Sequence, residues 1–205
     1  MAMKIINDIL YRYVEESNAQ EVMIPEGIIS IRHNAFNLCR NITSVTIPQS
    51  VISIGVRAFF DCRKLETVYI PENVEHVGSW AFYGCEKLKS ISVPFHIDEI
   101  GDRTFYGCEE LREVNIPNHV RRIGDYSFGY CFGLSNIKIP DSVTRIGKLS
   151  FGQCKNLKSI EIPSKVTKIG EHAFYNCNSE LVIYGESNSS AEQYAKVNGI
   201  KFKCR

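Results

Sequence analysis

Seven of the eight cysteines in this 205-residue chain follow one another at a constant spacing of 23 residues. Cysteines in such numbers could form disulfides or hold a metal ion. The series contains no C-x-x-C pair and no histidine at ligand spacing, which argues against zinc, and we expect no metal or cofactor. Equivalent sulfurs on stacked coils lie about 5 Å apart, so a spacing compatible with disulfides arises without any role in bonding. We therefore expect buried, reduced thiols that act as small hydrophobic side chains. The series is Cys39, Cys62, Cys85, Cys108, Cys131, Cys154 and Cys177.

The same period also governs the prolines, one set of phenylalanines and most glycines. Pro25 begins a series that includes every proline of the chain, and Phe36 begins a series that continues to Phe174. One unit reads I-P-x2-V-x2-I-G-x2-A-F-x2-C-x2-L-x2-V-x-I-P. Six consecutive periods without an insertion indicate a repeat protein whose coils superpose.

Each unit contains one segment with the alternation of a strand that buries one face. In Leu88-x-x-Ile91-x-Val93, apolar and polar residues alternate, and the proline that follows ends the strand. Stacked coils would then form a parallel sheet along one side. The glycine after the next Ile or Val is expected to turn the chain with φ > 0, and the segment from Gly78 to Cys85 to form a short helical or 3₁₀ turn. The prediction is an α/β leucine-rich-repeat solenoid of about seven coils, with short helical turns opposite the sheet.

Both ends of the repeat differ from its units, which predicts three parts: an N-terminal cap over 1–23, a solenoid over 24–180 and a C-terminal cap over 181–205. In the first cap, 5–14 and 21–24 suit short strands around a polar turn at 15–20. In the second, 181–183 suits a strand and 200–202 an edge strand. Between them, Ser189-x-x-Glu192 is a capping box for a short helix that Asn198-Gly199 would end.

The full unit resembles the BspA-like subfamily of leucine-rich repeats over roughly 24–205. The C-terminal segments Ser190–Ala195 and Gly199–Phe202 are also similar to the ending of that family. The resemblance implies a non-enzymatic binding module that recognises an unknown protein or glycan. Members of the family occur as adhesins on bacterial and protozoan surfaces, and also as proteins without a leader.

Charge and hydropathy exclude several other classes of partner. The 24 Lys and Arg balance 23 Asp and Glu, so no global basic field favours nucleic acid. No stretch approaches 18 apolar residues, which argues against membrane insertion. Residues 1–20 lack the regions of a secretory signal, so we expect a cytoplasmic protein. The alternative is a secreted or cell-surface protein if a leader precedes this sequence.

Aromatic residues suggest where a partner could bind. Trp80, Tyr83, Tyr106, Tyr126 and Tyr130 fall in the predicted turns, and exposed aromatic side chains are favoured interface anchors. The sheet face carries mostly small polar residues and offers only Tyr69 as an anchor. We therefore predict these six residues as partner-binding, against the alternative that several of the turn aromatics merely cover the edges of the core.

Two other functions compete with this interpretation. Asp98, Glu99 and Asp102 form the one local carboxylate cluster that would suit a carbohydrate-acting enzyme on a parallel β-solenoid. A purely structural or oligomerising scaffold is the third possibility. Residues 71–117 hold nine acidic and four basic side chains, whereas 118–170 hold three acidic and nine basic, which suggests head-to-tail self-association.

Overall fold

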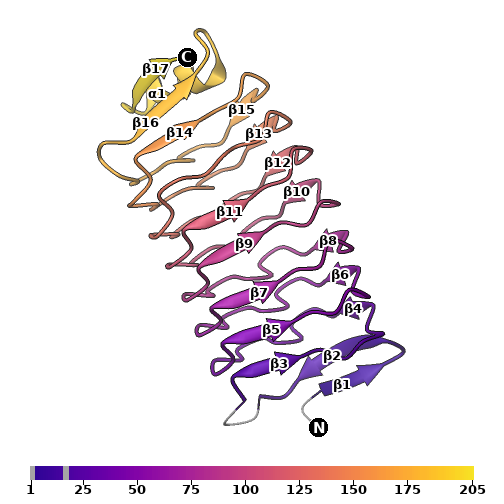
Figure 1. Ribbon diagram of the computed structural model, residues 1–205. Coiled ribbons are helices and arrows are strands. Elements are labelled where there is room, and N and C mark those ends of the chain that lie inside the picture. Colours follow the sequence, from indigo (N-terminus) through magenta and orange to yellow (C-terminus); the bar gives the residue numbers. More distant parts are fainter. Residues whose placement is uncertain (1–2, 16–18) are drawn as a thin grey trace.

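Each period of the repeat forms one coil of a solenoid in the computed structural model, which describes residues 3–15 and 19–205 (Figure 1). Three-residue strands precede the prolines, as the alternation of apolar and polar residues predicts. They pair in parallel from coil to coil within separate short sheets, so that Val45 lies opposite Val22 and Val68, whereas 67–69 and 90–92 fall in different sheets and 136–138, before Pro140, form no strand. These strands are β3 (Glu21–Met23), β5 (Ser44–Thr46), β7 (Thr67–Tyr69), β9 (Ser90–Ser92), β11 (Glu113–Asn115) and β14 (Ser159–Glu161).

A second ladder, which the sequence analysis missed, runs beside the first. Two-residue strands before the glycine position pair in parallel in two sheets, divided between 76–77 and 99–100, and Arg122 for example lies opposite Glu99 and Arg145. The isoleucine or valine of each strand faces the core, but the polar residue before it hides the pattern because the strand is so short. The strands are β4 (Ser30–Ile31), β6 (Ser53–Ile54), β8 (His76–Val77), β10 (Glu99–Ile100), β12 (Arg122–Ile123), β13 (Arg145–Ile146) and β15 (Lys168–Ile169).

The segments between the glycine position and the cysteine are chains of turns, so the expectation of a short helical or 3₁₀ turn is wrong. Within one coil, the N–H of Ala58 bonds to the carbonyl of Gly55 and that of Phe60 to Arg57. The amides between them, including that of Phe59, donate instead to carbonyls of the next coil. Because every second amide links two coils, these segments form a third connection along the axis, which a helix would not allow.

The repeated glycine serves close approach and not a positive φ, which corrects the second expectation. Gly78 is outside the left-handed region, but a Cβ on it would lie 2.4 Å from the backbone nitrogen of Val56 in the preceding coil. Left-handed backbone occurs two residues later, at Trp80 and its equivalents, where φ lies near 60° without glycine. The glycines therefore set how tightly the coils stack.

The repeated phenylalanines form a column inside the solenoid, as expected. From Phe36 to Phe174, successive ring centroids lie between 4.8 and 5.7 Å apart and the rings are nearly parallel. Tyr13 covers the first ring at 5.1 Å, and Tyr194 meets the last one edge-on at 5.7 Å. Burial of these rings and of the neighbouring aliphatic side chains holds the coils together.

The N-terminal segment contains an antiparallel hairpin, where the sequence suggested one strand. β1 (Met3–Ile6) pairs with β2 (Ile9–Tyr13), and Asn7 and Asp8 turn the chain with φ of 48° and 60°. Two consecutive left-handed residues are typical of hairpin turns. The polar turn expected at 15–20 includes residues outside the described part of the chain.

The C-terminal region closes the other end with a strand, a helix and a strand. β16 (Val182–Gly185) pairs with β14 and β17 (Lys201–Cys204), and α1 (Ser190–Val197) lies between β16 and β17 in the chain. The hydroxyl of Ser189 accepts a hydrogen bond from the amide of Glu192, as the capping box predicts. Gly199, with φ of 66°, follows the helix.

Candidate functional site

The repeated cysteines are structural groups of the interior. Each thiol from Cys62 to Cys177 donates a hydrogen bond of 3.0–3.3 Å to the carbonyl of the phenylalanine one coil earlier. All are free thiols, and burial raises the pKa of Cys39 and Cys177 to about 12. Such thiols stay protonated at neutral pH and are poor nucleophiles. They pack as expected, and in addition they link neighbouring coils.

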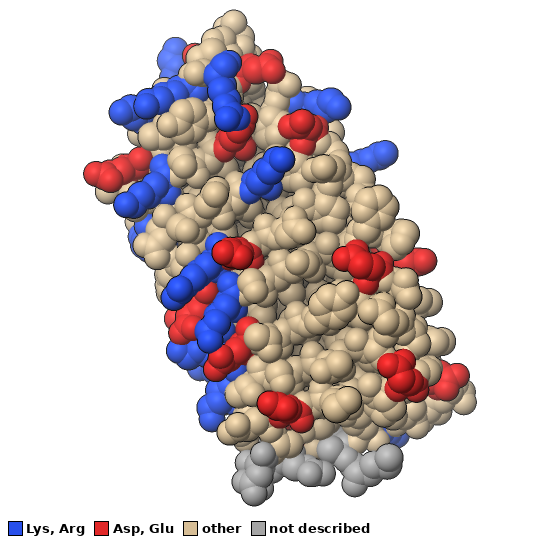
Figure 2. Space-filling model, viewed as in Figure 1, with Lys and Arg blue, Asp and Glu red and all other residues tan. Residues whose placement is uncertain are grey.

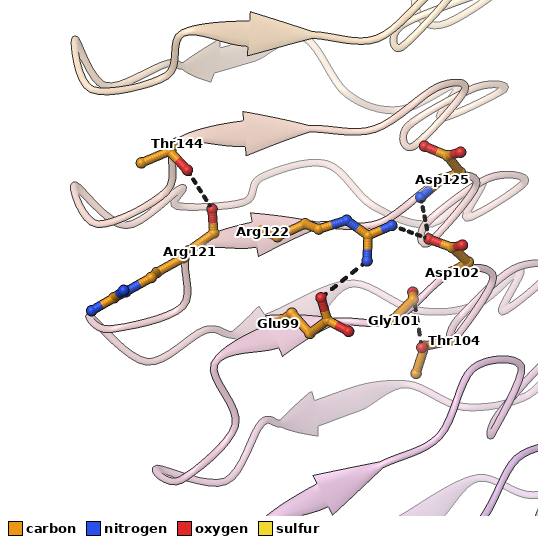
Figure 3. A network of polar contacts seen from close by, with 8 residues as sticks. All are labelled: Glu99, Gly101, Asp102, Thr104, Arg121, Arg122, Asp125 and Thr144. Atoms are coloured by element: carbon orange, nitrogen blue, oxygen red, sulfur yellow. Dashed lines mark hydrogen bonds and ion pairs between the residues drawn. The ribbon is translucent and has the colours of Figure 1, made fainter.

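The carboxylate cluster proposed for an enzyme is occupied by an arginine. Arg122 donates to Glu99 at 3.0 Å and to Asp102 at 2.6 Å, and Asp102 also accepts from the amide of Asp125 at 2.9 Å (Figure 3). Burial disfavours the charge on Arg122, but its bonds to Glu99 and Asp102 outweigh this and raise its pKa. Asp98 is exposed and does not join these contacts. The arrangement pairs charges and links coils, and it lacks the free acid and base that glycoside cleavage needs.

The face of the three-residue strands offers little for recognition. Figure 2 shows that its middle is largely free of charge, while charged side chains gather along the left border. Tyr69 is 57% exposed there, on β7, and makes no ring contact among the described residues. The structure thus separates Tyr69 from the other predicted anchors.

The remaining predicted aromatic residues come together in one cluster on the turns. Tyr83 stacks on Tyr106 with centroids 4.8 Å apart, and Trp80 lies 5.1 Å from Tyr83. Tyr106 also contacts Tyr130 at 5.1 Å and Tyr126 at 6.4 Å. Phe60 extends the stack, 4.7 Å from Tyr83.

Two arginines that the sequence analysis did not single out complete this cluster. The guanidinium carbon of Arg57 lies 5.0 Å from the ring centroid of Trp80, and that of Arg103 lies 4.6 Å from it. Arg103 also lies 4.3 Å from the ring centroid of Tyr126. These four residues occupy one repeat position on four successive coils, in the order Arg, Trp, Arg, Tyr. We call them the arginine–aromatic column. Their shared repeat position was the available signal, but the arginines were counted only as charge.

The backbone at this repeat position is left-handed in every coil, from Asn34 to His172. The four residues have φ between 54° and 64°, a region that disfavours residues with a Cβ by about 1 kcal/mol or more. Asparagine or glycine would suit the position better, and Asn34 occupies it in an earlier coil. Cation–π contacts of about 0.5–1 kcal/mol each offset part of this cost. The side chains thus occupy positions that the backbone alone would not favour.

The charges of the two arginines are not neutralised within the described part of the chain. No carboxylate of these residues lies within ion-pair distance of Arg57 or Arg103, whereas Asp61 binds both Arg40 and Arg63. The guanidinium N–H groups of both residues also make no hydrogen bond among the described residues. The cluster therefore presents ring edges, phenolic hydroxyls and two unpaired guanidinium groups. Partial burial, together with nearby Tyr130, raises the pKa of Tyr106 to about 12, so its hydroxyl stays a donor.

The repeated part of the chain matches a model of a known protein family. The family model for the BspA type leucine-rich repeat region matches six copies, over residues 5–132 and 121–196. The chain belongs to this family. The BspA-type repeat accounts for the constant period of the chain. No curated protein matched the sequence.

Solved structures of bacterial leucine-rich repeat proteins are similar to this BspA-type chain. A leucine-rich repeat protein from Eubacterium ventriosum is 26% identical with a TM-score of 0.77, and the match covers 83% of this chain but 46% of that one. One from Bacteroides ovatus is 26% identical with a TM-score of 0.54, covering 96% and 72%. A leucine-rich cell surface protein from Faecalibacterium prausnitzii, 22% identical over 88% and 73% with a TM-score of 0.50, shares the fold. This chain thus spans about half the length of the Eubacterium protein.

The described residues of the BspA-type chain also bear on membrane contact and metal binding. Their one α-helix, α1, has eight residues, and no helix among them is long and apolar enough to cross a membrane. The same residues hold no group of three or more histidine, cysteine or acidic side chains arranged for a metal ion.

Proposed function

We propose that this BspA-type leucine-rich repeat chain is a non-catalytic module that binds a partner protein through the aromatic–arginine cluster. The cluster consists of Arg57, Phe60, Trp80, Tyr83, Arg103, Tyr106, Tyr126 and Tyr130. The observation that carries the proposal is the arginine–aromatic column with its unpaired guanidinium groups. Tryptophan, tyrosine and arginine are the residues that dominate binding energy at protein interfaces.

The stacking of the rings favours a protein over a glycan. Sugars bind aromatic side chains through open ring faces, but Phe60, Tyr83 and Tyr106 cover one another face to face, with interplanar angles of 5° and 7°. An arginine from each neighbouring coil lies over Trp80. The groups left for a partner are ring edges, hydroxyls and guanidinium N–H groups, which suit the mixed polar and apolar surface of a protein.

Preorganisation supports the same proposal. The rings hold one another in place, and the turns that carry them are tied to both neighbouring coils by backbone hydrogen bonds. Side chains fixed before binding lose little conformational entropy when a partner arrives. The cluster also contributes to the stability of the fold, which does not conflict with binding.

A random 12-residue peptide library displayed on phage tests this proposal without knowledge of the natural partner. Peptides selected on the wild-type chain should bind Trp80→Ala and Tyr130→Ala at least tenfold more weakly, while Tyr69→Ala should bind them unchanged. Tyr130 is 41% exposed, so its replacement leaves the core intact. Unfolding in urea checks that each variant is folded.

Two outcomes of the phage experiment would contradict the proposed function. Failure to select any peptide, or selection of peptides that bind every variant equally well, would overturn the proposal. A parallel glycan array provides the competing outcome: glycans whose binding is lost in Trp80→Ala would assign the cluster to carbohydrate recognition.

A further inference from the structure

The two unpaired arginines of the cluster define a fixed spacing of positive charge. Arg57 and Arg103 lie two coils apart on either side of Trp80 in the column, with their guanidinium carbons 5.0 and 4.6 Å from its ring centroid. Coils repeat at about 4.8 Å, so the two charges are about 9–10 Å apart along the axis. The in-plane N–H groups of a guanidinium suit a carboxylate in bidentate geometry.

Arg57 and Arg103 combine two features, a guanidinium without a carboxylate partner among the described residues and a place over an aromatic ring. Arg40 and Arg63 meet Asp61 at 2.7 and 2.8 Å, and Arg122 meets Glu99 and Asp102. These three arginines are neutralised by carboxylates, whereas exposed arginines such as Arg121 have neither a carboxylate nor a ring as partner among the described residues. Arg57 and Arg103 stack on rings instead, which holds their charge at the surface.

We infer that the partner segment recognised by this cluster is an acidic, extended stretch of protein whose carboxylates bridge Arg57 and Arg103. The inference rests on the proposed function and specifies its partner. In a polyproline II segment, residues i and i+3 lie on the same face about 9 Å apart, which matches the spacing of the two arginines. Carboxylates at i and i+2 of a strand, about 6.6 Å apart, match it less well.

The aromatic side chains between the two arginines also suit an extended polyproline II segment. Trp80 lies between the two guanidinium groups, and the ring of Tyr83 is 5.1 Å from it. The exposed edges of these rings offer apolar surface for the prolines of such a segment. The hydroxyl of Tyr106 remains protonated and can donate to a backbone carbonyl, which a polyproline II segment leaves unpaired.

Synthetic peptides provide the test. The probe is (Glu-Pro-Pro)₄, compared with (Gln-Pro-Pro)₄ and with a peptide of the same composition whose four glutamates are adjacent. Binding is measured by calorimetry and by the fluorescence of Trp80, the one tryptophan of the chain. We expect (Glu-Pro-Pro)₄ to bind at least tenfold more tightly than either comparison peptide, and its affinity to fall with added salt.

Substitutions assign the binding to the two arginines. Arg57→Gln with Arg103→Gln should weaken binding of (Glu-Pro-Pro)₄ at least tenfold. Arg121→Gln is the matched control, because Arg121 is exposed at a different repeat position and points away from the Arg122 network (Figure 3). Arg103→Lys keeps the charge but loses the planar guanidinium, so it should weaken binding of (Glu-Pro-Pro)₄ by an intermediate amount. This single variant also provides a test if the double variant does not fold.

Several results would overturn the inference. These are equal binding of (Gln-Pro-Pro)₄, unchanged binding after the arginine substitutions, or tighter binding of a heparin oligosaccharide to the same residues. The proposed function can survive that outcome: phage-selected peptides that need Trp80 and Tyr130 but are not acidic would refute this inference alone. Peptides that need neither residue would refute both.

Discussion

The thiol of Cys108 donates a hydrogen bond to the carbonyl oxygen of Phe82 at 3.3 Å, so the sulfur of one coil is tied to the backbone of the coil before it. The same contact recurs from Cys62 to Cys177. A cysteine at this position therefore fills space and also provides a donor that alanine lacks. The cysteine series thus serves the stacking of the coils, and we assign recognition to the aromatic–arginine cluster.

Alkaline pH should destabilise the protein because of these thiols. Burial raises the pKa of Cys39 and Cys177 from 9.0 to about 12, and it raises the pKa of the five thiols between them as well. As the pH rises, the thiols lose their protons at lower pH in the unfolded chain than in the folded protein. The contribution of the protonated thiols to the stability of the fold is therefore complete below pH 9 and is lost as the pH rises towards 12. Each thiol should lower the free energy of unfolding by about 1.4 kcal/mol per pH unit in that range.

Urea unfolding under reducing conditions at several pH values checks this slope. Cys108→Ala serves as the comparison, because its unfolded state releases one proton fewer. Above pH 9, its free energy of unfolding should therefore fall less steeply with pH than that of the wild type, by about 1.4 kcal/mol per pH unit. Identical slopes for the variant and the wild type above pH 9 would contradict the assignment.

Close approach of the coils at glycine predicts a large effect of one methyl group. A Cβ at position 78 would lie 2.4 Å from the nitrogen of Val56 and 2.7 Å from the carbonyl carbon of Gly55. Both atoms belong to backbone and cannot rotate away, so Gly78→Ala should lower the free energy of unfolding by about 2–3 kcal/mol. Ser92→Ala on the exposed face of β9 should change it by less than about 0.5 kcal/mol. Equal midpoints of urea unfolding for Gly78→Ala and the wild type would show that the coils are not stacked this closely.

The charge of the arginine–aromatic column can be tested in the free protein. Trp80 lies between two unpaired guanidinium groups, which attract anions, so iodide should quench its fluorescence several-fold more efficiently than caesium. Replacing Arg57 and Arg103 by glutamine should remove the difference between the two ions. Acrylamide, which is neutral, reports any change in the exposure of the ring. Equal quenching by iodide and caesium in the wild type would mean that the two charges are neutralised in solution.

One coil lacks its three-residue strand, and hydrogen exchange should show it. Residues 135–139 form no strand, and their backbone groups make no hydrogen bond among the described residues. A groove of about 590 Å³ separates 136–139 from β14. We expect the amides of Asn136, Ile137 and Lys138 to exchange much faster than those of β9, which pairs with β11. Comparable protection of both segments would indicate that this coil forms its strand too.

The sequence predicted the repeat, the strand before every proline except Pro140 and the inward phenylalanines, because a constant period without insertions leaves one way to superpose the coils. The second ladder escaped prediction because a two-residue strand such as Arg122–Ile123 has no alternation to detect. The turns were mistaken for helices because their amides bond alternately within a coil and between coils, which only the stacked structure shows. The role predicted for Gly78 was wrong for a related reason. The local sequence suggests a turn with positive φ, but glycine is needed there because the backbone of the preceding coil leaves no room for a Cβ.

For the candidate site, the sequence predicted that the five aromatic residues of the turns lie together, and the structure brings them together, but the two arginines among them were missed. Trp80 and Tyr126 were counted as neighbours in the turns, while Arg57 and Arg103 share their repeat position and were overlooked. Tyr69 was predicted as a separate anchor on the sheet face, and the structure places it there, on β7. Periodicity locates a side chain on the coil, but only coordinates show that a charge has no partner.

Reactivity of the native thiols tests the central claim that the stacked coils hold the cysteine series inside and leave the turns to recognise a partner. Cys204 is exposed, whereas the seven repeated cysteines are buried or partly buried. Titration of the reduced, folded protein with a chromogenic disulfide reagent should therefore show one thiol per chain reacting within minutes, and the other seven only after unfolding. Rapid reaction of several thiols in the folded protein, or stoichiometric disulfides in the unreduced protein by mass spectrometry, would contradict the account.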